Sequence, residues 1–199
     1  MYNCFTIDSL TPNSYSEIRD YLINRLKPII KSNRNIIFVC IGTDRTTGDS
    51  LGPLIGYKLR FVKNNNINIY GSLENPIHSN NLSDILDKIK TNYKDPFIIA
   101  VNASLGSFQN VGKIIIENKP LHPSSSLGKD LSPIGDMNIT GIVNISGNSE
   151  FMILQNTRLY TVMSLADSIA GGIYHFILKS VGNKNSNSID LFPINSLIK

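Results

Sequence analysis

Apolar residues along the chain alternate between two spacings, which predicts helices and strands in turn. A helical spacing predicts amphipathic helices over residues 14–32, about 51–62, about 81–93 and about 157–180. Short apolar runs predict strands at residues 36–42, 67–73, 97–102 and 112–117, with one more at 139–145. This alternation indicates an α/β fold made of right-handed βαβ units around a mostly parallel sheet. We expect the strand at 112–117 to run antiparallel to the strand at 97–102, because the connection between them is short.

Three local features refine this outline. Ser14 is available to cap the first helix. The pair Gly171 and Gly172 lies inside the last helix, where glycine is unfavourable, so we expect close packing there to compensate. Lys119 to Gly135 is rich in Pro, Ser and Gly and reads as a long loop and a candidate lid.

The composition of the chain limits which kinds of protein it can be. The 199 residues, 41% of them hydrophobic, can bury one core, so we expect residues 1–199 to form a single domain. The net charge of +4 is scattered along the chain, so no nucleic-acid surface is expected. No apolar run suits a membrane span and the first residues do not resemble a signal peptide, so no membrane contact and a cytoplasmic location are expected. Cys4 and Cys40 lack a metal-like spacing; we expect a buried, reduced Cys40, no metal site and no cofactor.

The candidate chemistry gathers in the loops that follow the predicted strands. In an open parallel sheet ligands bind beyond the carboxyl ends of the strands, so these loops should converge. Asp49 precedes a helix and could serve as its N-cap or as a functional carboxylate. His78 could be an acid, a base or a metal ligand, or merely solvated, and Glu74 lies nearer the strand end. Asp44, in the loop of Asp49, is a supporting candidate.

Two further residues are weaker candidates. Asp136 could reach the same edge if the preceding loop folds over it, or it could be an ordinary turn carboxylate. Ser104 has neither a nucleophile elbow nor an evident His-Asp pair, which argues against serine hydrolysis. The two glycines near Asp49 could cradle a phosphate, but the loop lacks the spacing of a P-loop or a dinucleotide fold.

Three long segments, 41–53, 73–78 and 135–147, resemble the YyaC family of sporulation proteins, and the similarity covers roughly residues 35–175. That family is similar to the germination protease that degrades small acid-soluble spore proteins, and more remotely to the hydrogenase maturation endopeptidases. The resemblance implies a three-layer α/β/α sandwich of the phosphorylase/hydrolase-like (HybD-like) type. It also implies an atypical aspartic peptidase with a protein or peptide substrate.

The resemblance assigns two catalytic positions, and this chain departs from the pattern at one of them. Asp49 matches the first aspartate, whereas the second position is Asn102. Two carboxylates can share a proton and divide acid and base roles, but an amide cannot titrate usefully. A pair of Asp49 and Asn102 should therefore be impaired.

Three explanations of Asn102 stay open. It is a deliberate change that silences the enzyme, it marks a natural pseudo-enzyme that binds a peptide without cutting it, or Asp49 works with Asp136 or Glu74 instead. A non-catalytic binding module and a metal-dependent maturation peptidase are the alternatives to an aspartic peptidase. In the metal-dependent case Asp49, His78 and a group near position 102 would hold the ion.

Overall fold

The structure is a computed structural model that describes residues 4–122 and 132–181. Its strands are β1 (Cys4–Asp8), β2 (Ile36–Cys40), β3 (Ile67–Tyr70), β4 (Phe97–Gly106), β5 (Lys113–Glu117) and β6 (Met137–Ile145). Its helices are α1 (Ser14–Lys31), α2 (Leu51–Lys58), α3 (Leu82–Asn92), α4 (Glu150–Gln155) and α5 (Leu159–Val181). Two 3₁₀ turns are η1 (Gly48–Ser50) and η2 (Phe108–Asn110).

All six strands form one mixed sheet in the order β1-β5-β6-β4-β2-β3. The strands β6, β4, β2 and β3 are parallel, which confirms the predicted parallel centre. β5 runs antiparallel to β4 as expected, because it is antiparallel to β6, which is parallel to β4. The two strands are not paired with each other: β6, which comes later in the chain, lies between them, and β5 pairs with β6 and β1.

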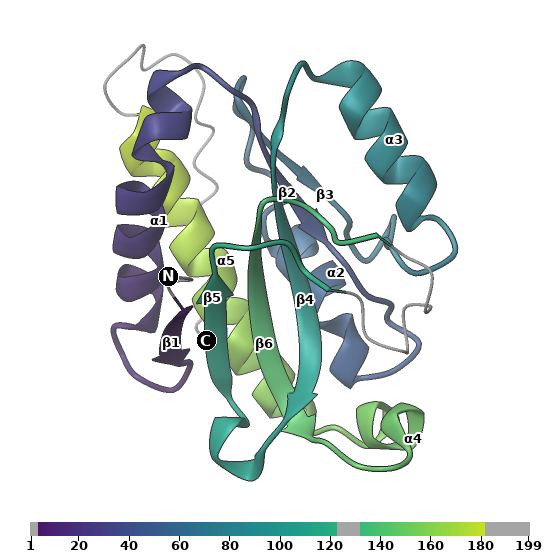
Figure 1. The fold of residues 1–199 in the computed structure, drawn as a ribbon. Helices are drawn as coiled ribbons and strands as arrows, with labels where there is room; N and C mark the ends of the chain where they lie inside the picture. Colours follow the sequence, from purple (N-terminus) through teal and green to yellow (C-terminus); the bar gives the residue numbers. More distant parts are fainter. Residues whose placement is uncertain (1–3, 123–131, 182–199) are drawn as a thin grey trace.

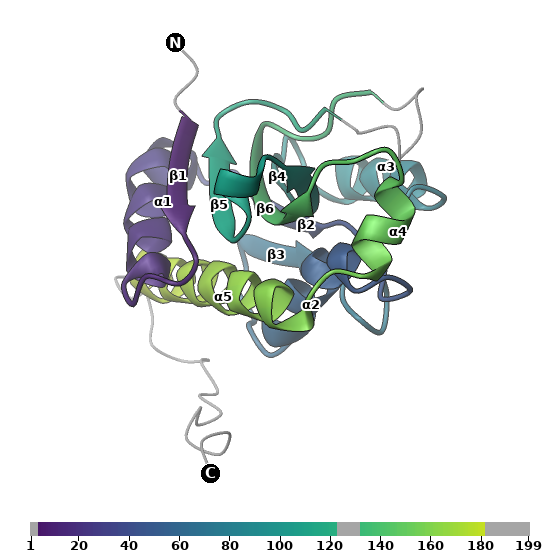
Figure 2. The ribbon, with the colours of Figure 1, turned by 90° about the horizontal axis from the view of Figure 1, so that it is seen from below.

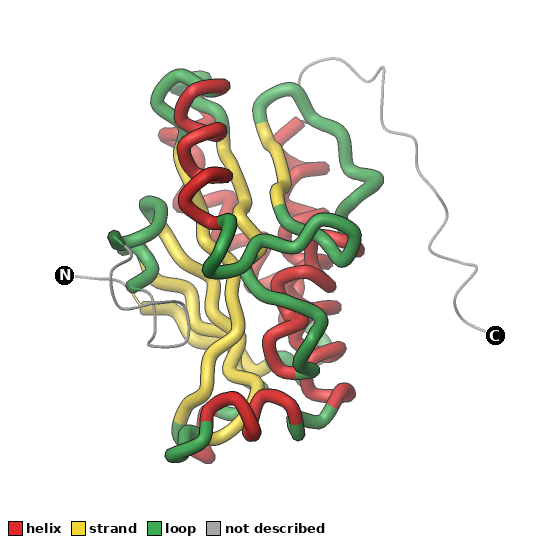
Figure 3. The backbone as a smooth tube through the Cα atoms, turned by 90° about the vertical axis from the view of Figure 1, so that its right-hand side faces the viewer, coloured by secondary structure: helices red, strands yellow, loops and turns green. Residues whose placement is uncertain are grey.

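Helices cover both faces of the sheet and give the α/β/α architecture (Figures 1 and 3). Figure 2 shows α1, α5 and α2 on one face, whereas α3 lies on the other. Along β2, the side chains of Ile36, Phe38 and Cys40 join the α1/α5 core, while Ile37 and Val39 join the α3 core. A strand buried on both faces must be apolar throughout, as β2 is.

The contact between α1 and α5 explains two features of the sequence. A β-carbon at Gly172 would lie 2.6 Å from the Ile18 β-carbon, so the expected close packing is confirmed at this glycine. Ser14 does not cap α1 as predicted. It is the first residue of the helix, and its buried hydroxyl donates a 2.9 Å hydrogen bond to Ser168 of α5.

The helix α5 is the one described helix that is long and apolar enough to cross a membrane, with 56% of that window buried inside the fold. It packs against α1, α2 and the sheet, which is how the core helix of a globular domain behaves. Cys40 is buried as expected, and burial raises the pKa of its thiol to about 12. The middle of the candidate lid, residues 123–131, lies outside the described residues, and its two ends meet where Leu121 pairs with Ile134.

Candidate active site

The order of the strands puts a natural binding position at the carboxyl ends of β2 and β4. β3 and β4 are the two neighbours of β2 in the sheet. The chain passes from β2 through α2 to β3, and then through α3 to β4 on the opposite side of β2. Adjacent strands whose connections leave on opposite faces form a crevice at their carboxyl ends, where ligands of open α/β sheets bind. Both Asp49 and Asn102 belong to this region, and η1 is in contact with β4.

The loop that carries Asp49 is closed by its own backbone. The Thr43 amide donates a 3.1 Å hydrogen bond to the Asp49 carbonyl. Gly42 has a φ of 147° and its missing β-carbon leaves room for that carbonyl, so a side chain at this position would collide with it. The backbone of residues 42–49 is thereby drawn into a tight ring that turns away from β2.

The carboxyl group of Asp49 does not cap a helix. Asp49 lies inside η1, the N-cap residues of η1 and α2 are Thr47 and Ser50, and no side chain caps either helix. Within the described part of the chain, Asp49 takes part in no ion pair. Burial raises the pKa of this carboxyl, and a hydrogen bond from the Thr43 backbone opposes the increase. The N-cap interpretation is therefore wrong.

The raised pKa of Asp49 predicts how stability changes with pH. A carboxyl whose pKa is higher in the folded state favours folding below its unfolded pKa of about 3.9, and that contribution is lost as the pH rises through the folded value. We expect Asp49→Asn to be more stable than the unmodified protein at neutral pH, with no difference below about pH 4. Urea unfolding at several pH values measures this, and exposed Asp44→Asn is the control. Equal gains from both changes would contradict it.

Asn102 is almost fully buried, with 8% of its surface exposed, and both ends of its amide are already bonded. Its Oδ1 accepts a 2.8 Å hydrogen bond from the Thr140 hydroxyl on β6. Its Nδ2 donates a 2.8 Å hydrogen bond to the carbonyl of Ala103. Sequence reasoning missed Thr140, although the alternation of polar and apolar residues along 137–141 places it on the same face as Asn138.

Asp49 and Asn102 lie at the same edge, but no hydrogen bond between their side chains occurs in the described residues. Asn102 lies two and four residues after Ala100 and Ile98, so its side chain points to the same face of β4 as theirs. Those side chains join the α3 core, and Asn102 therefore faces α3. Asp49 instead precedes α2, which packs on the opposite face. The two residues therefore belong to elements on opposite faces, near the point where the pairing of β2 with β4 ends.

Glu74 and His78 lie at this edge too, in a cleft of about 360 Å³ beyond β3. The Gly42 amide donates a 2.7 Å hydrogen bond to the Ile77 carbonyl, which ties this segment to the loop of Asp49. The His78 Nδ1 accepts a hydrogen bond from the Asn80 amide, so its Nε2 carries the proton when the ring is neutral. Glu74 is exposed, and no ion pair of the described chain includes it.

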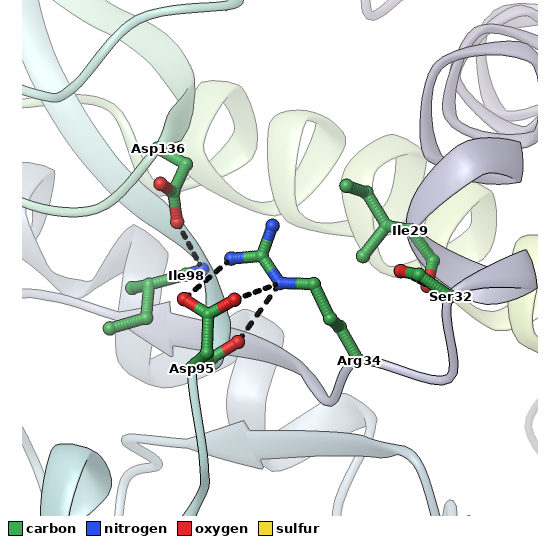
Figure 4. Close-up of polar contacts among 6 residues, drawn as sticks. All are labelled: Ile29, Ser32, Arg34, Asp95, Ile98 and Asp136. Carbon is green, nitrogen blue, oxygen red and sulfur yellow. Dashed lines mark hydrogen bonds and ion pairs between the residues drawn. The ribbon is translucent and has the colours of Figure 1, made fainter.

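Asp136 is not part of this edge. Its Oδ2 accepts a 2.8 Å hydrogen bond from the Ile98 amide, and its own amide donates to the Ile98 carbonyl (Figure 4). Ile98 is near the beginning of β4, next to the ion pair of Arg34 and Asp95. The expectation that Asp136 reaches Asp49 is wrong, because the residue before a parallel strand lies at the amino edge of the sheet.

The remaining candidates add little to the site. Ser104 donates only to the neighbouring Leu105 carbonyl, and Asp44 is exposed in the loop. No group of three or more His, Cys, Asp or Glu side chains in the described residues could hold a metal ion. The short helix α4, which sequence reasoning did not predict, packs on η1 and leaves Phe151 and Met152 64% and 53% exposed.

Comparisons with known proteins identify a family, a relative and a solved structure that are similar to this chain. Residues 6–172 match the family described as "Protein of unknown function (DUF1256)". The chain is 46% identical over 142 residues to "Uncharacterized protein YyaC" of Bacillus subtilis (strain 168), across 71% of this chain and 69% of that protein. A solved [NiFe] hydrogenase maturation protease, HycI from Thermococcus kodakarensis KOD1, is similar with a TM-score of 0.46 and 18% identity, over 78% of this chain and 99% of its own. The predicted resemblance to YyaC is confirmed.

Proposed function

The chain belongs to the DUF1256 family, and from that premise we propose that it is a peptidase-like protein impaired in catalysis. Asp49 is its catalytic carboxylate, and Asn102 occupies the position of a second one. The observation that carries the proposal is the state of Asp49: it lies in η1, which follows β2 and contacts β4, it caps no helix, and its pKa is raised by burial. A carboxyl whose pKa is moved toward neutrality is suited to exchange protons with water that attacks a peptide carbonyl.

Asn102 accounts for the impairment. An aspartic mechanism needs one carboxylate to activate the water and a second, neutral carboxylic acid to protonate the substrate. An amide can hydrogen-bond but cannot donate its proton to a leaving group. With Asn102 in place, Asp49 is the single group of the pair that can titrate.

The proposal includes the biological setting that the resemblance suggests. The substrate is a protein or peptide, with small acid-soluble spore proteins as the first class to test, and the protein acts in the cytoplasm of a sporulating cell or spore as a single domain. It needs no cofactor, nucleic acid or membrane. The exposed Phe151 and Met152 on α4, next to η1, would contact apolar side chains of a bound peptide.

Restoring the second carboxylate tests the proposal. We expect Asn102→Asp to cleave spore proteins or a mixed peptide library at least about 10²-fold faster than the unmodified chain, because general acid catalysis contributes 10²–10⁴. Adding Asp49→Asn to that variant should remove the gain. Product formation is followed by mass spectrometry, and exposed Asp44→Asn in the same background serves as the matched control.

A second function, non-catalytic peptide binding, is favoured by one specific observation. Both hydrogen-bonding ends of Asn102 are satisfied inside the protein, which suits a group that supports a site without reacting. If Asn102→Asp and the unmodified chain both fail to cut any peptide while peptides from the library still bind, the site is a binding module and the peptidase proposal is wrong.

A further inference from the structure

A line of hydrogen-bonded polar side chains crosses three strands on the α3 face of the sheet. The Thr140 hydroxyl lies 2.8 Å from Asn102 Oδ1 and 3.2 Å from Asn138 Oδ1. Asn138 Nδ2 in turn donates a 3.1 Å hydrogen bond to the Lys119 carbonyl and lies 3.5 Å from Glu117 Oε2. The line therefore links Asn102 of β4, through two residues of β6, to Glu117 at the end of β5.

This line is buried where it meets the site. Asn102 and Asn138 are 8% and 2% exposed in a sheet face that is otherwise apolar near α3. Buried polar groups of this kind are costly unless every one is hydrogen-bonded, and a satisfied network holds its members in one orientation. The side chain at position 102 is consequently fixed by its neighbours.

The Ala103 carbonyl sets the direction of the Asn102 amide. The pairing of β2 with β4 ends with a 2.7 Å hydrogen bond from the Ile41 amide to the Val101 carbonyl. In a parallel pair the next donor toward Ala103 would be the Thr43 amide, which turns away to the Asp49 carbonyl. The Ala103 carbonyl accepts a hydrogen bond from Asn102 Nδ2 instead. If the amide were flipped, Asn102 Oδ1 would face the Ala103 carbonyl oxygen and the two would repel each other.

We infer that Thr140 and Asn138 are positioning residues that hold the side chain at position 102 with a hydrogen-bond donor directed at the Ala103 carbonyl. An aspartate at position 102 would accordingly be kept as the neutral acid, because only the protonated form can donate to that carbonyl. The catalytic meaning of this rests on the proposed function: position 102 would supply the acid, and Asp49 the base. Asn102 reproduces the hydrogen bonding of that acid without its transferable proton.

The titratable groups on the elements in contact with β4 are Asp49 of η1, Cys40 of β2, and Tyr57 and Lys58 of α2, while β6 has none, and Lys58 is paired with Asp167 at 2.7 Å. On α3, whose face Asn102 shares, the charged side chains are exposed: Asp84, Asp87, Lys88 and Lys90. At the far end of the line the Glu117 carboxylate is paired with the Lys119 ammonium at 2.9 Å. In the described residues the hydrogen-bond contacts of the Asn102 side chain are the Ala103 carbonyl and the Thr140 hydroxyl, so these two groups decide the charge at position 102.

The pKa of the carboxyl introduced by Asn102→Asp, followed by NMR during a pH titration, tests the inference. We expect a value at least about one unit above the ordinary 3.9. Adding Thr140→Val should bring the pKa back toward the ordinary value, because the carboxyl group can then turn away from the Ala103 carbonyl, whereas Thr140→Ser should keep it raised. An ordinary pKa in Asn102→Asp, or a pKa that Thr140→Val leaves unchanged or raises, would overturn the inference.

A measurement on the unmodified chain covers the case in which Asn102→Asp does not fold. We expect the Asn102 side-chain amide protons to exchange with solvent at least about tenfold more slowly than those of exposed Asn80, and Thr140→Val but not Thr140→Ser to speed the exchange. Equal exchange at Asn102 and Asn80 would contradict the inference. Neither readout needs peptide cleavage, so failure of the proposed function leaves both results interpretable.

Discussion

Gly52→Ala is expected to lower the free energy of unfolding by about 2–3 kcal/mol, the cost of overpacking a tight contact. Gly52 and Gly56 lie one turn apart on the same side of α2, and both face backbone at the carboxyl edge of the sheet. A β-carbon at Gly52 would lie 2.8 Å from the Ile41 carbonyl carbon and amide nitrogen. These are backbone atoms that no side-chain rotation can move, so α2 would have to shift away from β2.

The shift would also move Asp49, because η1 leads directly into α2. Urea unfolding measures the loss of stability, and the cleavage assay in the Asn102→Asp background measures the loss of the site. Gly147→Ala is the matched control: this exposed glycine has only the flexible end of Ile153 nearby, so we expect a change within about 0.5 kcal/mol. Similar effects of the two changes would show that the close approach of α2 is unimportant.

Phe176→Ala should have the largest effect on stability in the core, a loss of about 3–5 kcal/mol. Phe176 of α5 and Phe38 of β2 are both fully buried, and their rings meet edge to face with centroids 6.5 Å apart. Removing the ring leaves a cavity between the sheet and the helix that covers it, and the rigid β-sheet cannot collapse to fill it. A loss of this size is a large part of the 5–15 kcal/mol that stabilises a typical domain.

The same substitution at an exposed phenylalanine separates burial from residue type. Phe151 is 64% exposed on α4, and we expect Phe151→Ala to change the free energy of unfolding by no more than about 0.5 kcal/mol. Both variants are compared by urea unfolding at one pH. Equal losses would falsify the assignment of Phe176 to the core.

The central elements of the fold were predictable because their patterns are long or wholly apolar. β2 and α5 have such patterns, and the structure places both in the core. β1 and α4 were missed because five and six residues are too few to display a period. The direction of β5 relative to β4 was predictable from their short connection, but its place beyond β6 was not, because neighbours in sequence are not always neighbours in a sheet.

The candidate site was predictable in part. The rule that ligands bind beyond the carboxyl ends of parallel strands predicted that Asp49, Glu74 and His78 lie at one edge, and the structure places them together there. The same rule, applied to the strand that Asp136 precedes, would have placed that residue at the opposite edge. The bonds that fix Asn102 depend on where the pairing of β2 and β4 ends, a property of the folded backbone that composition does not reveal.

The first strand of the chain lies at one border of the sheet and pairs with β5, and the first helix packs on the last one. Residues 4–31 therefore find their partners only after residues 113–117 and 159–181 have been synthesised. During translation the apolar side of α1 lacks its main partner until α5 has left the ribosome. Contacts between such distant segments also slow folding, because the entropy of the intervening loop is lost before the contact stabilises anything. The core of this domain is thus expected to form only after α5 has been synthesised, rather than stepwise from the N-terminus.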